Sequence, residues 1–505
     1  MAQNVKITTI AKLADVASAA RGRAQRVVHC HGVFDLLHIG HIRYLQKARR
    51  LGDVLVVTLT PDRFVNKGPH RPAFTDQIRA ATLAALDCVD YVAINEWPTA
   101  AEAIVRLQPA VYAKGGEFRD EKTPELMREE EAAAQVGTQI EFIDDVTSSS
   151  SHLINNYLGL FSEDVEEYLT RFKACYGEAT LAETMHRAAT LKVLVVGEAI
   201  IEESYACNTL GRSMKAPIIA AQYESHELYA GGALAVANHV SAFCDAVGLV
   251  AMLGAENPQE EWIRSTIAGN VATTFVAKSD SPTIVKRRYL ESYFGTPLFE
   301  INYLNQQALS ADDDKQLCAA LEASVENYDA VIVADYGHSM LSENARGVIC
   351  DRARFVAVSP QVNAANVGYQ TITKYPRADF VVLAQQELEL ECRNRSRSLR
   401  EMVLQLVDLV DVSTVAVTVG KRGCLCYNRA AGFHEAPALA TKVVDRAGAG
   451  EAFFAVTSLC AVLDVPLDML AFLGNVAGAE AVGVVGNSRF LERLPFTRHI
   501  QSLLK

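Results

Sequence analysis

The chain has 505 residues, of which 50% are hydrophobic and 21% are charged, which is ordinary for a globular protein. A single hydrophobic core rarely serves a chain of this length, so we expect two or three domains. The formal net charge of −12 argues against a general nucleic-acid binder, but it is compatible with a local basic pocket for phosphates.

The eleven cysteines are odd in number and scattered, and only Cys424 and Cys426 lie close together in the sequence. This usage suits reduced thiols in a cytosol rather than a disulfide framework. No apolar run approaches the length of a membrane span, and the first residues lack the apolar core of a signal peptide. We therefore expect a cytoplasmic protein with no membrane partner and no nucleic-acid partner.

Residues 27–53 carry the strongest local pattern. An apolar, β-branched strand runs into a turn at Gly32, and His38-Ile39-Gly40-His41 then opens an amphipathic helix that ends at Gly52. Residues 54–59 form the next strand. The pattern predicts a β-turn-α-β unit of a parallel sheet with two histidines at the helix N-terminus.

The two histidines suggest phosphate chemistry. Free N–H groups and the positive end of the dipole at a helix N-terminus favour phosphate, and His38 and His41, one turn apart, would add directed donors. Together they could hold a triphosphate and neutralise the charge that develops when its α-phosphate is attacked. Two other interpretations are half a zinc site, for which no cysteine or third histidine lies at ligand spacing, and histidines that merely pack or cap.

The rest of this half also reads as α/β. The expected elements are helices at 8–22, 76–86, 100–107 and 119–135 and strands at 91–94, 111–116 and 140–143. Lys67 and Arg71 lie on a loop that either faces a nucleotide or is a solvated turn, and Arg79 is expected on the polar side of its helix. Lys114-Gly115-Gly116 ends a strand and should lie beside the histidines, because the carboxyl ends of strands form the ligand crevice of an α/β sheet.

The string GVFDLLHIGH resembles the H-x-G-H signature of the cytidylyltransferase-like nucleotidyltransferases. The wider spacing is similar to the adenylyltransferase half of bacterial bifunctional heptose-phosphate enzymes. The resemblance covers nearly the whole domain and is carried by Phe34, Asp35, His38, His41, Lys67, Arg79 and Lys114-Gly115-Gly116. It implies that the hydroxyl run containing Ser149 and Ser150 reaches the triphosphate, whereas the residues alone indicate first of all a helix N-cap.

Residues 161–190 are amphipathic and read as a packed pair of connecting helices rather than a flexible tether. Beyond them, strands at 191–196, 331–335 and 415–419 each lead into glycines or acids, and a glycine pair opens a helix that runs through Asn238. Small residues at 447–450, including Gly448 and Gly450, precede an apolar helix over 452–462. Their N–H groups could bind an anion, and Glu451 could act as base on a sugar hydroxyl, or the segment could be a plain turn.

Residues 191–490 resemble the ribokinase-like sugar kinases. Gly231 and Gly232 through Asn238 look like the first family signature, and residues 445–451 look like the second. The resemblance implies that Thr418, Gly420 and Gly423 bind the nucleotide and that Asp335 lies near the phosphates and a metal ion.

Departures from the family pattern accompany these matches. Glu451 replaces the catalytic Asp, and Glu198 and Glu202 replace two early sugar-binding acids. The metal-binding N-x-x-E segment keeps only Glu387. An Asp→Glu change lengthens the arm by one methylene, and a misplacement of about 1 Å can cost on the order of a hundredfold in rate. The pocket is therefore either adapted to another acceptor or belongs to a kinase with little or no activity.

The sequence thus predicts an α/β protein with a Rossmann-like nucleotidyltransferase domain followed by a larger ribokinase-like α/β domain. The expected boundaries are an N-terminal helix at 1–25, the first domain at 26–160, a helical linker at 161–190 and the second domain at 191–505. The expected reaction joins an NTP (CTP or ATP) to a sugar phosphate and releases pyrophosphate, with Mg²⁺ as cofactor. Kinase activity of the second domain and a role as sensor or dimer scaffold both stay open, and we expect a homodimer.

Overall fold

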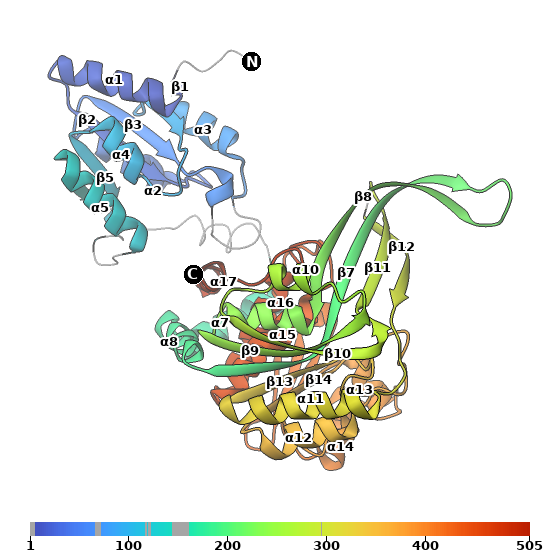
Figure 1. The fold of residues 1–505 in the computed structure, drawn as a ribbon. Helices are drawn as coiled ribbons and strands as arrows, with labels where there is room; N and C mark the ends of the chain where they lie inside the picture. Colours follow the sequence, from blue (N-terminus) through green and yellow to red (C-terminus); the bar gives the residue numbers. More distant parts are fainter. Residues whose placement is uncertain are drawn as a thin grey trace. The chain divides into compact units, whose positions relative to one another are not determined.

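The computed structural model describes residues 6–65, 72–116, 119, 123–143, 161–293 and 295–504. The predicted site residues Lys67, Ser149 and Ser150, together with Arg71, lie outside these ranges. The chain divides into two units, the first comprising residues 1–160 and the second residues 161–500 (Figure 1).

A parallel six-stranded sheet in the order β1-β4-β3-β2-β5-β6 forms the centre of the first unit. The strands are β1 (Ile7–Thr8), β2 (Val27–Gly32), β3 (Val54–Leu59), β4 (Tyr91–Ile94), β5 (Val111–Gly115) and β6 (Gln139–Ile143). The strand order reverses at β2, which has β3 on one side and β5 on the other. In open α/β sheets a ligand binds at such a switch point, beyond the carboxyl ends of the strands.

Helices cover both faces of this sheet. They are α1 (Ile10–Gly22), α2 (Ile39–Arg49), α3 (Asp76–Ala84), α4 (Ala101–Leu107) and α5 (Pro124–Val136), with a short 3₁₀ turn, η1, at Asp62–Phe64. Successive strand residues point to opposite faces, so Val28 packs with Leu45 of α2 on one side, whereas Val27 packs with Leu13 of α1 on the other. The strands are apolar on both faces for this reason.

Three local predictions need correction. Residues 1–25 contribute a strand as well as the predicted helix, because β1 pairs with β4. Helix α2 ends at Arg49 rather than at Gly52, and Gly52 serves a different need, since a Cβ there would lie 2.6 Å from the carbonyl oxygen of Arg26. The charged helix expected from residue 119 begins at Pro124, capped by the Thr123 hydroxyl.

The second unit is built on a large sheet in the order β10-β9-β7-β13-β14-β15-β16-β17-β18. Strands β10 to β16 on this path run parallel, and β17 and β18 are antiparallel. Their bounds are β7 (Lys192–Arg212), β9 (Ala246–Glu256), β10 (Val271–Pro282), β13 (Ala330–Asp335), β14 (Val356–Pro360), β15 (Ala378–Ala384), β16 (Val412–Thr418), β17 (Cys424–Asn428) and β18 (Gly432–Ala436).

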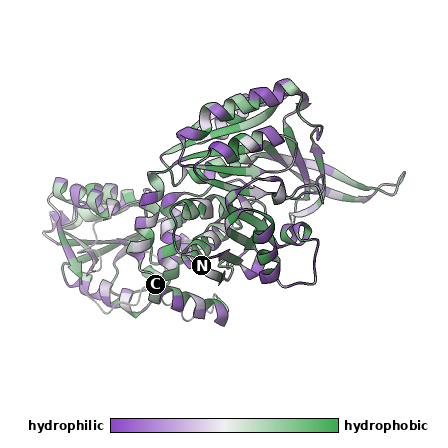
Figure 2. Ribbon diagram, turned by 90° about the horizontal axis from the view of Figure 1, so that it is seen from below, coloured by the Kyte–Doolittle hydropathy of each residue, from purple (hydrophilic) through white to green (hydrophobic). Residues whose placement is uncertain are grey.

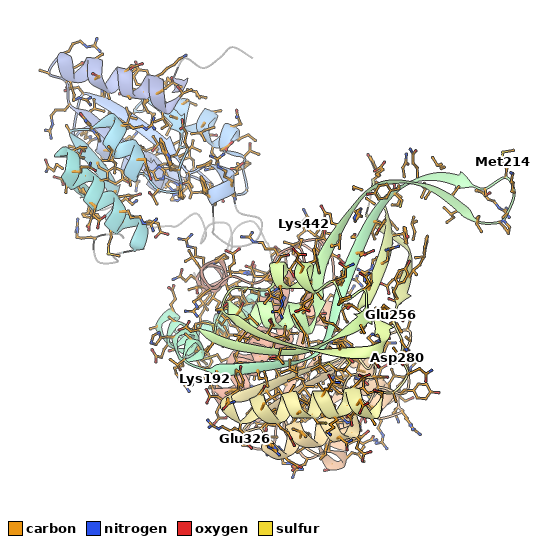
Figure 3. All side chains as sticks on the ribbon, viewed as in Figure 1. Lys192, Met214, Glu256, Asp280, Glu326 and Lys442 are labelled. Atoms are coloured by element: carbon orange, nitrogen blue, oxygen red, sulfur yellow. The ribbon has the colours of Figure 1, made fainter. Side chains whose placement is uncertain are left out.

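A smaller sheet grows from the same long strand. The predicted strand at 191–196 does not end there, because β7 continues to Arg212 and pairs with β8 (Ile219–Gly232) and β11 (Ile284–Glu291). Strand β12 (Thr296–Tyr303) then pairs with β11. The far ends of β7 and β8 form a projecting hairpin with Met214 at its tip (Figure 3). We call the sheet of β8, the second half of β7, β11 and β12 the small sheet.

The helices of the second unit flank the large sheet. They are α7 (Glu163–Cys175), α8 (Glu178–Ala189), α9 (Ala233–Ser241), α10 (Glu260–Thr266), α11 (Ala311–Ser324), α12 (Glu343–Arg352), α13 (Gln385–Glu391), α14 (Leu399–Leu409), α15 (Ala449–Val462), α16 (Leu467–Ala481) and α17 (Arg493–Leu504); 3₁₀ turns are η3 (Val325–Asn327), η4 (Ile372–Lys374) and η5 (Gly420–Arg422). Figure 2 shows apolar strands inside and more polar helices outside. None of the helices in the described ranges is long and apolar enough to span a bilayer.

The two helices expected over 161–190 are present as α7 and α8 and pack within the second unit. Phe172 stacks on Phe472 of α16 with 4.1 Å between ring centroids, and the Tyr176 hydroxyl donates to Asp468 at 2.7 Å. These contacts fix the segment against the body of the unit, as expected for packed helices rather than a tether.

Candidate active sites

His38 and His41 lie at the start of α2, at the switch point of the first sheet. His38 is the N-cap, and its Nδ1 accepts from the Gly40 N–H at 3.1 Å. The His41 ring lies 4.1 Å from the His38 ring, between centroids, and packs against Phe34. The predicted pair therefore stands at a helix N-terminus, where unsatisfied N–H groups and the helix dipole favour anions.

The His38 ring is set up as a hydrogen-bond donor. Burial lowers the pKa of its imidazole below the usual value, so the ring is neutral at physiological pH. Since Nδ1 accepts, the proton of the neutral ring resides on Nε2. Nε2 is buried and has no hydrogen-bond partner among the residues that the structure describes. A buried donor without a partner at an anion-binding helix end is suited to a phosphate oxygen.

The loop between β2 and α2 is held tightly. Phe34 is buried and adopts a positive φ of 48°, and a Cβ on Gly32 would come 3.2 Å from its ring. Asp35 accepts from the N–H groups of Ala73 at 2.6 Å and Phe74 at 3.3 Å. Asp35 thus ties this loop to the segment before α3, and Gly32 makes room for Phe34.

Arg79 is buried, not on the polar side of α3 as we expected. Its guanidinium donates to the carbonyl oxygens of Val33, Thr60 (2.9 Å) and Phe74 (3.0 Å), and it pairs with Asp62 at 2.6 Å. It is 1% exposed. The reason is geometric, because the loops after β2 and β3 converge on α3 and present carbonyl groups that need donors. A phosphate contact of Arg79 stays a prediction.

Lys114 lies at the end of β5 next to a buried acid. Its ammonium is 2.5 Å from Glu129 of α5 and 3.3 Å from the Tyr112 hydroxyl. Glu129 also accepts from the Ala100 N–H at 3.2 Å. The charge of Lys114 is therefore compensated inside the unit, and its predicted contact with phosphate, like that of Gly115, remains a prediction.

In the second unit, the carboxyl ends of parallel strands meet at one edge of the large sheet. Strand β13 delivers Asp335 there, β15 delivers Ala384 before α13, and β16 delivers Thr418. Helix α15 packs against β13 and β15. Asp335, Ala384 and Thr418 therefore lie along a common edge.

Glu198 and Asp335 form a buried acidic pair beneath this edge. Glu198 accepts from the N–H groups of Tyr336 and His338, both at 3.0 Å. Burial, and then the charge of Asp335, raises the pKa of Glu198. Burial alone would raise the pKa of Asp335 too, but Lys374 at 2.7 Å and the Tyr375 hydroxyl at 2.6 Å hold it below its usual value.

Gly231 and Gly232 are required by close approach of β7. A Cβ at position 231 would lie 2.8 Å from Cγ of Glu202, and one at position 232 would lie 2.6 Å from the carbonyl oxygen of Glu198. Gly232 also has a positive φ of 61° and is the N-cap of α9. The first signature thus places two predicted acids and a helix start together.

Glu202 and Glu451 face the same space from different elements. Glu451, in the first turn of α15, accepts from the Tyr336 hydroxyl at 2.8 Å. Burial, and then the charge of Glu451, raises the pKa of Glu202 to about 7. Asn487 contacts Glu202 at 3.5 Å.

The segment before α15 forms a tight helix start. Gly448 is the N-cap with φ 82°, and a Cβ there would collide with the side-chain oxygen of Asn487. Asp445 holds the loop by accepting from the N–H groups of Arg446 at 2.6 Å and Gly486 at 2.9 Å. This places the N–H groups near Gly450 and Glu451 at a helix N-terminus, as expected for an anion site.

The remaining predicted residues fall into two groups. Gly420 and Gly423 have positive φ values of 57° and 96° and shape the turn after β16, next to Thr418. Asn238 is buried on α9 and bonds the backbone of Thr266 at 3.0 Å and Ala268 at 2.9 Å. Its described contacts are within the fold, and a sugar contact stays a prediction.

Glu387 caps α13. It accepts from the N–H groups of Val362 at 2.9 Å and Ala384 at 2.7 Å, and its pKa is raised to about 7, chiefly by burial. It therefore lies at the same strand edge as Glu451, whose charge contributes to the shift.

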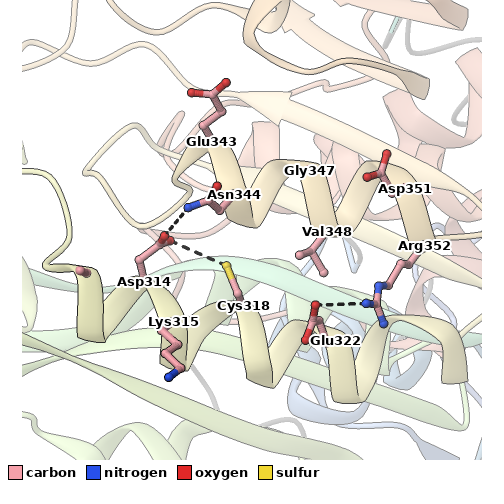
Figure 4. Close-up of a pocket in the computed structure, with 11 residues that line it drawn as sticks. Asp314, Lys315, Cys318, Glu322, Glu343, Asn344, Gly347, Val348, Asp351 and Arg352 are labelled. Carbon is pink, nitrogen blue, oxygen red and sulfur yellow. Dashed lines mark hydrogen bonds and ion pairs between the residues drawn. The ribbon is translucent and has the colours of Figure 1, made fainter.

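A surface groove of about 690 Å³ lies between α11 and α12, away from this edge (Figure 4). Interactions between its side chains include Asn344 donating to Asp314 at 2.7 Å and Arg352 donating to Glu322 at 3.1 Å. No predicted site residue lines it.

Comparison with known families decides the classification. Residues 190–493, more than half of the chain, match the family described as pfkB family carbohydrate kinase. The chain belongs to this family. Residues 29–156 match the cytidylyltransferase-like family. The two resemblances inferred from the motifs, and the fold class, are thereby confirmed.

Curated relatives share this sequence in part. The Bifunctional protein HldE of Syntrophotalea carbinolica is 41% identical over 161 residues, which cover 31% of this chain and 32% of the relative. That of Pelobacter propionicus is 43% identical over 153 residues, 30% of each. The alignments thus span about a third of these relatives.

A solved structure confirms the fold of the second unit. Escherichia coli phosphofructokinase-2, in complex with potassium, is 15% identical with a TM-score of 0.51, and the match covers 63% of this chain and 100% of that one. At this identity the likeness concerns the fold alone.

Several residues of the sites were not singled out from the sequence. Glu129 pairs with Lys114, and Lys374 and Tyr375 hold Asp335 across about forty positions of the chain. Tyr336 stands next to Asp335, but nothing in the sequence marks its contact with Glu451. Of these residues, only Tyr336 could have been chosen as a candidate from the sequence, because it is a polar aromatic residue at the end of a strand.

Proposed function

We propose that this protein is a nucleotidyltransferase fused to a sugar kinase. In the first unit an NTP, either CTP or ATP, reacts with a sugar phosphate and releases pyrophosphate. The observation that carries this proposal is Nε2 of His38, which has no partner among the described residues and stands beside His41 at the N-terminus of α2. The relatives named as bifunctional proteins support it.

The proposed chemistry of the first unit needs positioning and charge stabilisation more than a covalent nucleophile. A phosphate oxygen of the sugar phosphate attacks the α-phosphorus of the NTP, the bond to the bridging oxygen breaks, and pyrophosphate leaves. His38 and His41 donate to phosphate oxygens as negative charge builds on the leaving group. Lys67, Lys114, Arg79, Ser149 and Ser150 are the further nucleotide contacts that we propose.

In the second unit we propose phosphoryl transfer from ATP to a sugar hydroxyl. Glu451 takes the proton of the hydroxyl, and the N–H groups at 448–450 hold the transferred phosphate. Thr418, Gly420 and Gly423 would contact the nucleotide. Glu198, Glu202, Asn238 and the glycine pair would shape the sugar side of the pocket.

We propose Mg²⁺ as the cofactor at both sites. Within the described ranges no three His, Cys, Asp or Glu side chains are grouped to hold a metal alone. That fits Mg²⁺, which usually binds through one or two carboxylates plus substrate phosphates. In the second unit Glu387 suits this role better than Asp335, because Lys374 already neutralises Asp335. Bound there, the ion would offset negative charge on the phosphates.

One observation favours a second candidate, in which the second unit binds ligand without turnover as a sensor or scaffold. Asp335, the acid expected beside phosphates and metal, already bonds Lys374 and Tyr375. Such a unit would gain stability with ATP or sugar and form no phosphorylated product, because a ligand that binds only the folded state stabilises it.

We further propose a homodimer in the cytoplasm. All eleven cysteines are free, which suits a reducing compartment. The face of the small sheet opposite Glu202 carries exposed Phe299, Ile301 and Tyr303 around the Glu203–Arg287 ion pair. A second copy of the chain would bury these rings. The charges of the Glu203–Arg287 pair balance each other, so two such faces would not repel one another. Sedimentation equilibrium tests this through the mass.

The experiment that tests the main proposal is pyrophosphate release with CTP or ATP and a panel of sugar phosphates. We expect release by the wild type and a loss of on the order of a hundredfold or more in His41→Ala, in line with removal of a transition-state donor. His434→Ala, on strand β18 of the second unit, is the matched control. A folded wild type that releases no pyrophosphate with any pair would contradict the proposal.

A further inference from the structure

Tyr336 lies where three parts of the second unit meet. Its backbone N–H donates to Glu198 of β7 at 3.0 Å, and its carbonyl accepts from the side chains of Asn363 at 2.9 Å and Asn366 at 2.8 Å. The side chain is 6% exposed. Its backbone is thus fixed on both sides, and burial leaves its ring little freedom to move.

The Tyr336 hydroxyl donates to Oε1 of Glu451 at 2.8 Å. Burial, together with the negative charge of Glu451, raises the pKa of Tyr336 well above its ordinary value, so the hydroxyl keeps its proton and stays a donor. A carboxylate with one oxygen held in this way presents the other in a defined direction. Glu451 itself is only half-buried and would otherwise have rotational freedom at the end of a long arm.

The small sheet reaches the same ring. The ammonium of Lys286, on β11, lies 5.3 Å from the centroid of the Tyr336 ring. Lys286 is the register partner of Glu202 on β7, so both project from the same face of the small sheet. Tyr336 therefore connects α15, the end of β13 and the small sheet around one carboxylate.

We propose that Tyr336 is a positioning residue for phosphoryl transfer, which holds Oε1 of Glu451 so that Oε2 accepts the proton of the acceptor hydroxyl. This inference rests on the proposed kinase activity. In that step the hydroxyl oxygen bonds the γ-phosphorus of ATP, the bond from that phosphorus to the bridging oxygen breaks, ADP leaves, and the proton passes to Oε2. The hydrogen bond explains how a glutamate serves where the family usually has the shorter aspartate.

The test compares Tyr336→Phe with wild type in a steady-state kinase assay of the full-length protein with ATP and a panel of sugars and sugar phosphates. Tyr336→Phe removes one oxygen and keeps the ring against Lys286. We expect kcat to fall roughly tenfold or more with KM for ATP unchanged, the scale of a hydrogen bond to a charged group. Tyr176→Phe, which removes a similar 2.7 Å bond to Asp468 away from this edge, is the matched control and is expected to match wild type.

Glu451→Asp breaks the same hydrogen bond from the other side. A shorter arm withdraws the carboxylate from Tyr336, so we expect a comparable fall in kcat. In the Glu451→Asp background, Tyr336→Phe should then change kcat by no more than about twofold, because the two changes remove one interaction. Glu451→Asp alone provides the test if Tyr336→Phe does not fold.

The outcomes separate the two proposals. An active wild type with an unaffected Tyr336→Phe, or a gain of activity in Glu451→Asp, overturns the role of Tyr336 and leaves the kinase activity standing. A wild type that transfers phosphate to no acceptor overturns both. Two other results would contradict positioning of Glu451. One is a Tyr336→Phe variant in which only KM changes. The other is a Tyr336→Phe substitution that lowers kcat by the same factor in wild type and in Glu451→Asp.

Discussion

Arg79 holds together the loops around the first candidate site. One guanidinium donates to carbonyl groups from the segments after β2, after β3 and before α3, and pairs with Asp62. Such a fork suits arginine, because it presents several N–H donors in fixed directions and lysine does not. The sequence predicted Arg79 on the polar side of a helix. Its burial depends on loops that are distant in the chain, and no local pattern predicts such contacts.

Replacing Arg79 should destabilise the first unit more than an exposed arginine would. Arg79→Lys keeps the charge but leaves most of the carbonyl groups without a donor, so we expect a loss of about 3–5 kcal/mol in the free energy of unfolding. Urea denaturation followed by circular dichroism measures it. Arg63→Lys, whose exposed side chain makes one backbone bond, is the control and should change little. An unchanged midpoint for Arg79→Lys would contradict this account.

His29 and His31 make the stability of the first unit depend on pH. Both are buried and share the Thr58 hydroxyl at 2.8 Å, and burial lowers the pKa of each to about 3. Between pH 6.5 and 3 these two histidines bind protons in the unfolded chain but not in the folded one. The free energy of unfolding should therefore fall as the pH falls through this window.

Urea titrations of the first unit's transition at several pH values test this. His29→Gln removes one of the two titrating groups, so we expect a shallower fall between pH 6.5 and 4 than in wild type. A stability of the first unit that is flat over this range would contradict neutral, buried histidines.

At the scale of elements, strand β7 belongs to both sheets of the second unit. Its first half is an apolar run, which the sequence predicts well. Its second half carries Glu202 and Glu203 and pairs with β8 and β11, and nothing local shows that the strand continues. By contrast β3 and β4 match their predicted bounds, because each is a short apolar run between turn residues.

At Gly231 the backbone of β8 lies too close to a side chain of β7 to leave room for a Cβ atom. Gly231→Ala places a methyl 2.8 Å from Cγ of Glu202, so Glu202 or the small sheet must shift. We expect a loss of about 1–3 kcal/mol in stability and a lower kcat for phosphoryl transfer. Thermal unfolding and the kinase assay measure these.

Gly347→Ala is the control for this substitution. It lies inside α12 with nothing within 4 Å of its Cβ position, and it should leave activity unchanged and stability equal or higher. Equal behaviour of the Gly231→Ala and Gly347→Ala variants would contradict the close approach at Gly231.

The whole chain joins two α/β units, and both units use the same arrangement. In each unit the candidate residues gather at carboxyl ends of parallel strands and at a helix N-terminus, α2 in one and α15 in the other. The motifs predicted both positions, because glycines, histidines and acids at strand ends leave a local signature. Partners that tune them, such as Glu129 and Lys374, come from tertiary packing and leave none.

We propose that one chain carries out two phosphate chemistries at separate sites. Phosphorus NMR resolves pyrophosphate from ADP, so one reaction mixture that contains NTP, a sugar and a sugar phosphate can be compared for three proteins. We expect both products from wild type, loss of pyrophosphate alone in His41→Ala and loss of ADP formation alone in Glu451→Gln. Loss of both products in either variant, or wild type yielding neither, would contradict it.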